Sequence, residues 1–209
     1  MKRTILVLLI VSFALALAGC SESQSQAIIP EIEFVASEGQ PCPQLKASGG
    51  DANPVIDTIN AEIKAHFLAL IPRSASGAAM EGVTVHTFVS STDTVISVLL
   101  KQEFEMVYGT DGAVWGICYD YKDRMIVPCG AYLSSQGYSY SETYEKIWKL
   151  LLETSAYETV GIPCFYFDSN SDPILVVEAL EHPSGAEPWN RIYYYSIKEG
   201  SFVSAPMYD

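Results

Sequence analysis

The sequence predicts an α+β protein with antiparallel sheets, each packed by one helix, in two subdomains of similar size. Two segments carry apolar residues at helical spacing, and segments with alternating apolar and polar residues follow each of them. Turn residues separate these alternating segments, which is typical of hairpin-linked strands. A helix followed by antiparallel strands therefore occurs twice, at residues 41–131 and at residues 132–209.

The first helix is predicted between Asn53 and Pro72. Asn53 can cap the free N–H groups, Pro54 fits the first turn, and Pro72 ends the helix. Apolar residues at spacings of 3, 4, 4 and 3 share one face. These residues are Ile56, Ile59, Ile63, Phe67 and Leu70.

Strands are predicted at residues 83–90, 94–108 and 114–121. The second strand carries Ile96, Val98, Leu100, Phe104 and Met106 on one side, and Lys101, Glu103 and Glu105 on the other. We therefore expect the charged side of this strand to face solvent. Thr110-Asp111-Gly112 is a turn signal before the third strand, and Asp123-Arg124 can turn that strand back into residues 125–127.

The second helix is predicted from Ser139 to about Thr154, because Ser139 and Glu142 have capping-box spacing. Its apolar stripe consists of Tyr144, Ile147, Trp148, Leu151 and Leu152. Three strands, at residues 164–167, 174–180 and 191–197, are predicted to close the chain.

The first twenty residues have the order of a bacterial lipoprotein signal. Lys2 and Arg3 precede an apolar run at residues 5–17, and Leu17-Ala18-Gly19-Cys20 closes the segment. The run is too short for a comfortable membrane span, and a cysteine after small residues can receive lipid. We expect residues 1–19 to be a signal peptide and Cys20 to be lipidated. An ordinary signal peptide with an incidental cysteine is the alternative.

Residues 20–40 are rich in Ser, Gln and Glu, which predicts a flexible tether with room for one short strand at its end. The chain would then be exported and held on the cell envelope, at the cell membrane or at an outer membrane. Without Lys2 and Arg3, the mature chain has ten Lys and Arg against twenty-five Asp and Glu, a formal net charge of −15. Such a surface repels phosphate backbones and excludes nucleic acid, but it suits solubility or a cationic partner.

Four cysteines follow Cys20, namely Cys42, Cys118, Cys129 and Cys164. In an exported chain, four cysteines predict two disulfides with three pairings. If Asp123-Arg124 is the centre of a hairpin, Cys118 faces Cys129 at a distance that a disulfide can span. We therefore predict Cys118–Cys129, which leaves Cys42–Cys164. No Cys-x-x-Cys spacing exists and the histidines are scattered, so no metal site is expected.

No catalytic residue and no cofactor is predicted. Asp168-x-Asn170-x-Asp172 opens like a calcium loop, but Pro173 and Ala179 occupy the positions that need Gly and Glu, so a polar turn is expected. Glu181-His182 lacks an accompanying nucleophile motif. Core and sheet packing is the expected role of most aromatic residues, and a sugar-stacking platform is the alternative. The aromatic residues considered are Trp115, Tyr138, Tyr140, Tyr144, Trp148, Trp189 and Tyr193-Tyr194-Tyr195.

Short motifs between residues 41 and 198 resemble one family of modules. They are Pro43-Gln44-Leu45, Asn53, Ile59-Asn60, Ile96-Ser97-Val98, Tyr108-Gly109, Tyr119-Asp120-Tyr121, Cys164-Phe165-Tyr166-Phe167, residues 174–177, His182-Pro183-Ser184-Gly185 and Arg191-Ile192-Tyr193. This extracytoplasmic module is shared by PdaC-type peptidoglycan deacetylases, as their non-catalytic N-terminal part, and the RsiV-type lysozyme-sensing anti-sigma factor. The chain departs from it in its four cysteines and in lacking a Gly-Ala-His-Gly-like stretch after Tyr108-Gly109.

The resemblance implies a binding or sensing module at the cell wall, since the family's deacetylase activity belongs to a separate domain. We therefore expect a non-catalytic module whose ligand is a cell-wall glycan or a protein, with a cationic protein as one candidate. The alternative is an envelope-acting hydrolase with a carboxylate-based or histidine-based site. Two carboxylates meeting in one pocket would favour that alternative.

Overall fold

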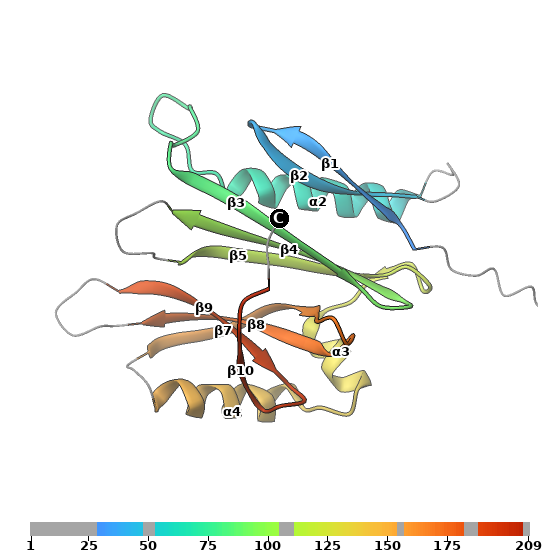
Figure 1. Cartoon of the computed structure of the whole chain (residues 1–209), viewed down its shortest axis with the longest axis vertical. Helices are drawn as coiled ribbons and strands as arrows, with labels where there is room; N and C mark the ends of the chain where they lie inside the picture. Colours follow the sequence, from blue (N-terminus) through green and yellow to red (C-terminus); the bar gives the residue numbers. More distant parts are fainter. Residues whose placement is uncertain (1–28, 48–52, 105–110, 154–156, 182–187, 207–209) are drawn as a thin grey trace, which may run out of the picture.

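Two four-stranded antiparallel sheets pack face to face, and a helix covers the outer face of each (Figure 1). The computed structural model describes residues 29–47, 53–104, 111–153, 157–181 and 188–206. The elements along the chain are β1 (Glu31–Ser37), β2 (Gln40–Lys46), α2 (Pro54–Ala69), β3 (Val83–Ser91), β4 (Val95–Phe104), β5 (Asp111–Asp120), β6 (Met125–Ile126), α3 (Cys129–Ser135), α4 (Tyr140–Leu152), β7 (Tyr157–Phe167), β8 (Pro173–Glu181), β9 (Trp189–Ser196) and β10 (Ser201–Val203). The fold is α+β with antiparallel sheets, as predicted.

Helix α2 forms where the sequence predicts it. The Asn53 side chain accepts hydrogen bonds from the backbone N–H groups of Val55 and Ile56, and Pro54 occupies the first turn. The predicted apolar face is buried against the first sheet, whose strand order is β3-β4-β5-β6. Strands β1 and β2 form a separate hairpin beside α2, so part of the predicted tether is a strand (Figure 1).

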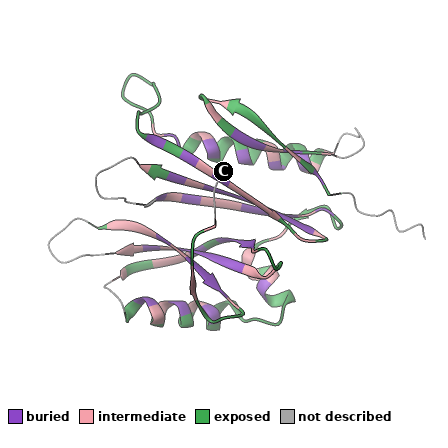
Figure 2. Ribbon diagram, in the orientation of Figure 1, coloured by how far each residue is buried: buried purple, intermediate pink, exposed green. Residues whose placement is uncertain are grey.

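The first sheet is covered on both faces, which differs from the prediction of one solvent-facing side. Residues Val95 to Leu100 are all buried, and Leu99 packs between the two sheets. Only the end of β4 near Glu103 is exposed. Buried residues accordingly run along the strands of both sheets (Figure 2). The prediction was wrong here because the second sheet supplies an apolar partner for this face.

The second sheet, in the order β10-β9-β8-β7, is also apolar on both faces. Along β7, Cys164 and Tyr166 face the first sheet, whereas Phe165 and Phe167 pack toward α3 and α4. This alternation follows from the pleat, since successive side chains point to opposite faces. The Ser97 hydroxyl donates to the Phe165 carbonyl at 2.8 Å and ties the two sheets together.

Helix α4 is capped as predicted, because the Ser139 hydroxyl accepts from the Glu142 N–H at 3.4 Å. Ile147 and Leu151 are buried, but Leu152 is 51% exposed and does not belong to the packed stripe. The short helix α3 was not predicted. Its Leu133 is buried in the second core, so the predicted boundary between residues 131 and 132 lies inside α3.

The β5–β6 hairpin has a different register from the predicted one. Tyr119 pairs with Ile126, and the Val127 N–H donates to the Cys118 carbonyl at 2.8 Å. The turn spans residues 121–124, and the Asp120 carboxylate stabilises it by accepting from two backbone N–H groups. Cys118 therefore lies opposite Val127, and the predicted opposition to Cys129 was wrong by two residues.

Candidate functional site

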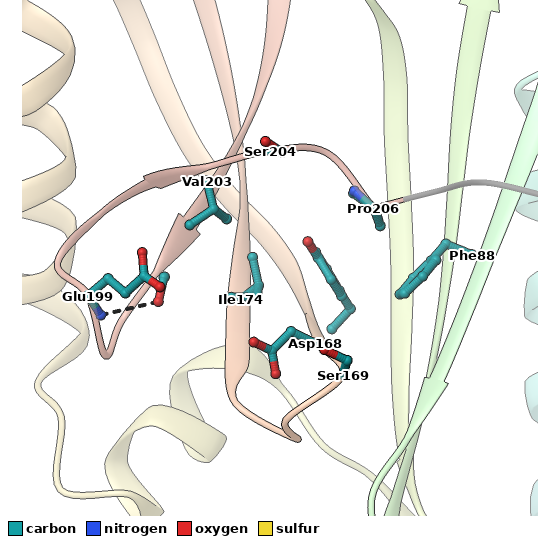
Figure 3. A pocket seen from close by; sticks show the side chains of 10 residues that line it. Phe88, Asp168, Ser169, Ile174, Glu199, Val203, Ser204 and Pro206 are labelled. Atoms are coloured by element: carbon teal, nitrogen blue, oxygen red, sulfur yellow. Dashed lines mark hydrogen bonds between the residues drawn. The ribbon is translucent and has the colours of Figure 1, made fainter.

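A pocket of about 340 Å³ opens between the two sheets, at the side where β3 approaches the β7–β8 turn and the β9–β10 hairpin (Figure 3). Val203, at the end of β10, and the following Ser204 and Pro206 form part of the wall (Figure 3). Ten residues line it, namely Phe88, Tyr166, Asp168, Ser169, Ile174, Ser196, Glu199, Val203, Ser204 and Pro206. The site is therefore assembled from both halves of the chain.

Two aromatic rings form the apolar part of the pocket. Phe88 on β3 meets Tyr166 on β7 edge to face, with 5.0 Å between ring centroids and 75° between planes. Phe88 reaches the second sheet because alternate β3 residues point away from α2. Each ring thus comes from a different sheet.

Tyr166 is the most informative polar residue of the pocket. The residue is only 4% exposed, and its hydroxyl has no hydrogen-bond partner within the described part of the chain. Burial, together with the nearby Tyr194 and Asp168, raises the pKa of Tyr166. The hydroxyl therefore stays protonated and can donate a hydrogen bond into the pocket.

The rim of the pocket is acidic. One oxygen of Asp168 accepts from the N–H groups of Asn170 and Asp172, at 2.8 and 2.9 Å, and this fixes the β7–β8 turn. Glu199 lies on the β9–β10 turn, where its N–H donates to the Ser196 hydroxyl (Figure 3). Lys198 binds Asp172 at 2.6 Å and does not line the pocket. Anionic ligands are therefore disfavoured.

Glu181 and His86, outside the pocket, are engaged in local contacts. The Glu181 carboxylate accepts from Trp189 Nε1 and Arg191 Nε, both at 3.0 Å, and its predicted neighbour His182 lies outside the described residues. His86 pairs with Glu103 at 2.7 Å. In the described ranges, no group of three or more His, Cys, Asp or Glu side chains could hold a metal ion.

The aromatic residues considered for a sugar-stacking platform do not all share one surface. Tyr193, Tyr194 and Tyr195 alternate between the two faces of β9, so they cannot present one surface. Trp115 stacks on His66 of α2, at 4.3 Å between ring centroids, and packs in the core between α2 and the first sheet. The sequence analysis instead missed Phe88. The sequence did contain a signal for Phe88. Thr84, His86, Phe88 and Ser90 alternate on the face of β3 that points away from α2, and Phe88 is the large apolar residue among them.

The four cysteines Cys42, Cys118, Cys129 and Cys164 are free thiols. Cys42 belongs to the core between α2 and the first sheet, whereas Cys164 belongs to the core between the sheets. The first sheet therefore separates them, and the predicted Cys42–Cys164 pairing was wrong. Cys118, Cys129 and Cys164 instead line a second pocket, of about 210 Å³.

The predicted signal peptide and Cys20 lie outside the described residues. Among the helices that the structure does describe, none has the length and apolar character needed to cross a bilayer. No family model matches the chain, and no curated protein matches it.

Proposed function

We propose that the chain is an exported lipoprotein, held on the cell envelope through lipid on Cys20, that acts as a non-catalytic binding or sensing module. Its ligand site is the pocket between the two sheets. The observation that carries this proposal is the Tyr166 hydroxyl: the residue lines the pocket, and no described residue forms a hydrogen bond with this hydroxyl. A ligand that supplies an acceptor would replace the water that this hydroxyl meets in the pocket, which contributes about 1 kcal/mol to the binding free energy.

The lining favours a ligand that is polar at its edges and apolar on its faces. The rings of Phe88 and Tyr166 offer apolar surface, while Asp168, Glu199 and the serine hydroxyls offer hydrogen-bonding groups. A neutral glycan of the cell wall combines these properties. A cationic protein segment is the second ligand class, because the acidic rim and the net charge of −15 for the mature chain would attract it.

The resemblance to the module of PdaC-type deacetylases and RsiV-type sensors supports the same function class. That module contains no catalytic domain of its own. The lipobox-like Leu17-Ala18-Gly19-Cys20 supports the location at the envelope. No ligand-binding residue is carried over from the family; the pocket residues come from the structure of this chain alone.

The decisive experiment measures binding by the Tyr166→Phe variant, which removes only the hydroxyl. Calorimetric titrations with tetra-N-acetylchitotetraose, soluble peptidoglycan fragments and lysozyme, as a cationic protein, test the ligand classes separately. We expect about five- to tenfold weaker binding of one of them, as the loss of one hydrogen bond of ~1 kcal/mol implies. Tyr138→Phe, at an exposed tyrosine outside the pocket, is the matched control. Equal affinities of both variants would contradict the proposal.

An envelope-acting hydrolase is the second candidate, because Asp168 and Glu199 line the same pocket. Glycoside hydrolysis needs two carboxylates across a substrate. One oxygen of Asp168 is, however, engaged by two backbone N–H groups of its turn, which favours a structural role. Turnover of glycoside or ester substrates that disappears in Glu199→Gln would support the hydrolase and exclude the non-catalytic proposal.

A further inference from the structure

Strand β1 has one edge that no other described strand covers. β1 pairs only with β2, and five of its seven residues are exposed. Phe34 is 50% exposed and Val35 is 42% exposed, and the two side chains point to opposite faces of the strand. Because β1 lies at the margin of the molecule (Figure 1), its second edge, the open edge, faces solvent.

The turn of the β1–β2 hairpin determines which backbone groups point to the open edge. Glu38 and Gly39 form a two-residue turn with φ of 51° and 79°. Such a turn makes the residues on either side of it a hydrogen-bonded pair, and these pairs recur at every second residue. The odd-numbered residues of β1 therefore bond to β2, and the even-numbered residues direct their N–H and C=O groups to the open edge. These residues are Ile32, Phe34 and Ala36.

The edges of the other outer strands are blocked or short. Pro41 and Pro43 leave the outer edge of β2 without two of its N–H groups. Asn60 bonds to both backbone groups of Leu45 on the same edge. Gln40 binds the edge of β3 in the same way, register shifts interrupt β7, and β6 and β10 have only two and three residues. Such features prevent pairing with another chain, so among the described strands β1 is the one whose edge is available for it.

We propose that the open edge of β1 is a dimer interface, where β1 of a second copy of this chain pairs antiparallel and the two hairpins form one four-stranded sheet. A two-fold axis at Phe34 makes this contact isologous, so the edge must be complementary to itself. Phe34 then pairs with its equivalent, and Ile32 pairs with Ala36 of the second copy. All of these backbone groups point outward, which allows about six interchain hydrogen bonds. The exposed Phe34 rings also meet across the axis, and opposed aromatic side chains stabilise antiparallel pairs.

Charge selects this register among those that the outward-pointing groups allow. Glu31 lies opposite Ser37 of the second copy. Glu33 lies opposite Val35 of the second copy, so no two carboxylates are directly opposed. The two Glu33 carboxylates stand on a diagonal, and each lies 3.8 Å from the Lys46 ammonium of its own hairpin. An axis at Glu33 would oppose these carboxylates directly, whereas an axis at Val35 would shorten the paired segment.

Cysteine cross-linking in cells that produce the full chain tests both the interface and its register. Phe34→Cys places two thiols on the axis, where opposed Cα atoms about 5.5 Å apart lie within the range of a disulfide. Val35→Cys is the matched control, because this neighbouring position is similarly exposed but its two copies stand on a diagonal, about 7–8 Å apart. After mild oxidation, non-reducing electrophoresis should show a linked dimer for Phe34→Cys and much less of it for Val35→Cys. Equal yields, a higher yield for Val35→Cys or no dimer from Phe34→Cys would overturn the proposal.

Two lysine variants test the same register through charge. Phe34→Lys opposes two ammonium groups on the axis and should weaken dimerisation roughly tenfold. Val35→Lys instead places each ammonium opposite Glu33 of the second copy and should leave dimerisation unchanged or stronger. Sedimentation velocity of the purified chain over a range of concentrations measures the dissociation constants, and thermal unfolding checks that both variants fold. A monomeric unmodified chain, or equal weakening by both substitutions, would contradict this interface. Neither residue lines the pocket between the sheets, so the result is independent of ligand binding there.

Discussion

Asn60 on α2 binds both backbone groups of Leu45 on β2. Its Oδ1 accepts from the Leu45 N–H, and its Nδ2 donates to the Leu45 carbonyl, each at 2.8 Å. The amide side chain thus takes the place of a neighbouring strand at the free edge of the β1–β2 hairpin. Gln40 does the same for β3, where it accepts from the Val85 N–H and donates to the Val83 carbonyl.

The first prediction concerns Asn60→Ala. The substitution leaves both Leu45 groups without their protein partner, and two lost hydrogen bonds should lower the free energy of unfolding by about 1–3 kcal/mol. Urea unfolding measures the loss, and hydrogen exchange should become faster at the Leu45 N–H. Lys64→Ala, at an exposed position of the same helix, should leave both measurements nearly unchanged. Unaltered exchange at Leu45 in Asn60→Ala would contradict the prediction.

The second prediction concerns close packing between the sheets. A Cβ at Gly116 would stand 2.7 Å from Cys164 Sγ and 2.9 Å from its Cβ, closer than atoms can pack. Gly116→Ala should therefore force β5 and β7 apart and destabilise the fold by about 1–3 kcal/mol. Gly161→Ala is the matched control, since it also lies in a strand but has no atom within 4 Å of an added Cβ. Thermal unfolding compares the two, and equal midpoints would be inconsistent with this packing.

The third prediction concerns alkaline pH. Burial raises the pKa of Cys118 from 9.0 to about 12 and that of Cys129 to about 11. Between pH 9 and these values the unfolded chain loses protons that the folded chain keeps, so the free energy of unfolding falls as pH rises. The fall is about 1.4 kcal/mol per pH unit for each thiol, and this contribution is fully present below pH 9.

Urea unfolding between pH 8 and pH 11 measures this dependence. Buried tyrosines also lower the free energy of unfolding as pH rises. The contribution of Cys118 is therefore the difference between the pH dependence of the unmodified chain and that of Cys118→Ser. The variant should lose stability less steeply with pH, by about 1.4 kcal/mol per unit. Parallel profiles would mean that Cys118 titrates as in the unfolded chain.

The fourth prediction concerns the proposed lipid attachment. Cys20→Ala removes the thiol that would receive lipid, so the chain should lose metabolic labelling by a fatty acid and remain as an uncut precursor. Cys42→Ala serves as the control and should retain full labelling, because Cys42 is buried in the folded domain. Label that persists on Cys20→Ala would rule out this attachment site.

Local chemistry made several elements predictable from the sequence. Asn53 and Pro54 define the start of α2, and the spacing from Ile56 to Phe67 defines its buried face, since both depend on residues within one helix. The polar turn at residues 168–172 followed from its Asp and Asn side chains, which bond to nearby backbone groups. The α+β class followed from the same local patterns.

Only the tertiary structure decided how the two halves meet. The sequence could not indicate that the second sheet covers the Leu99 side of β4, because a strand shows which residues alternate but not what lies opposite. The same packing separates Cys42 from Cys164 and brings Cys118, Cys129 and Cys164 to one pocket. It also joins Phe88 to Tyr166, two rings 78 positions apart in the chain. Local periodicity determines elements, whereas a site between two sheets depends on contacts that no local pattern contains.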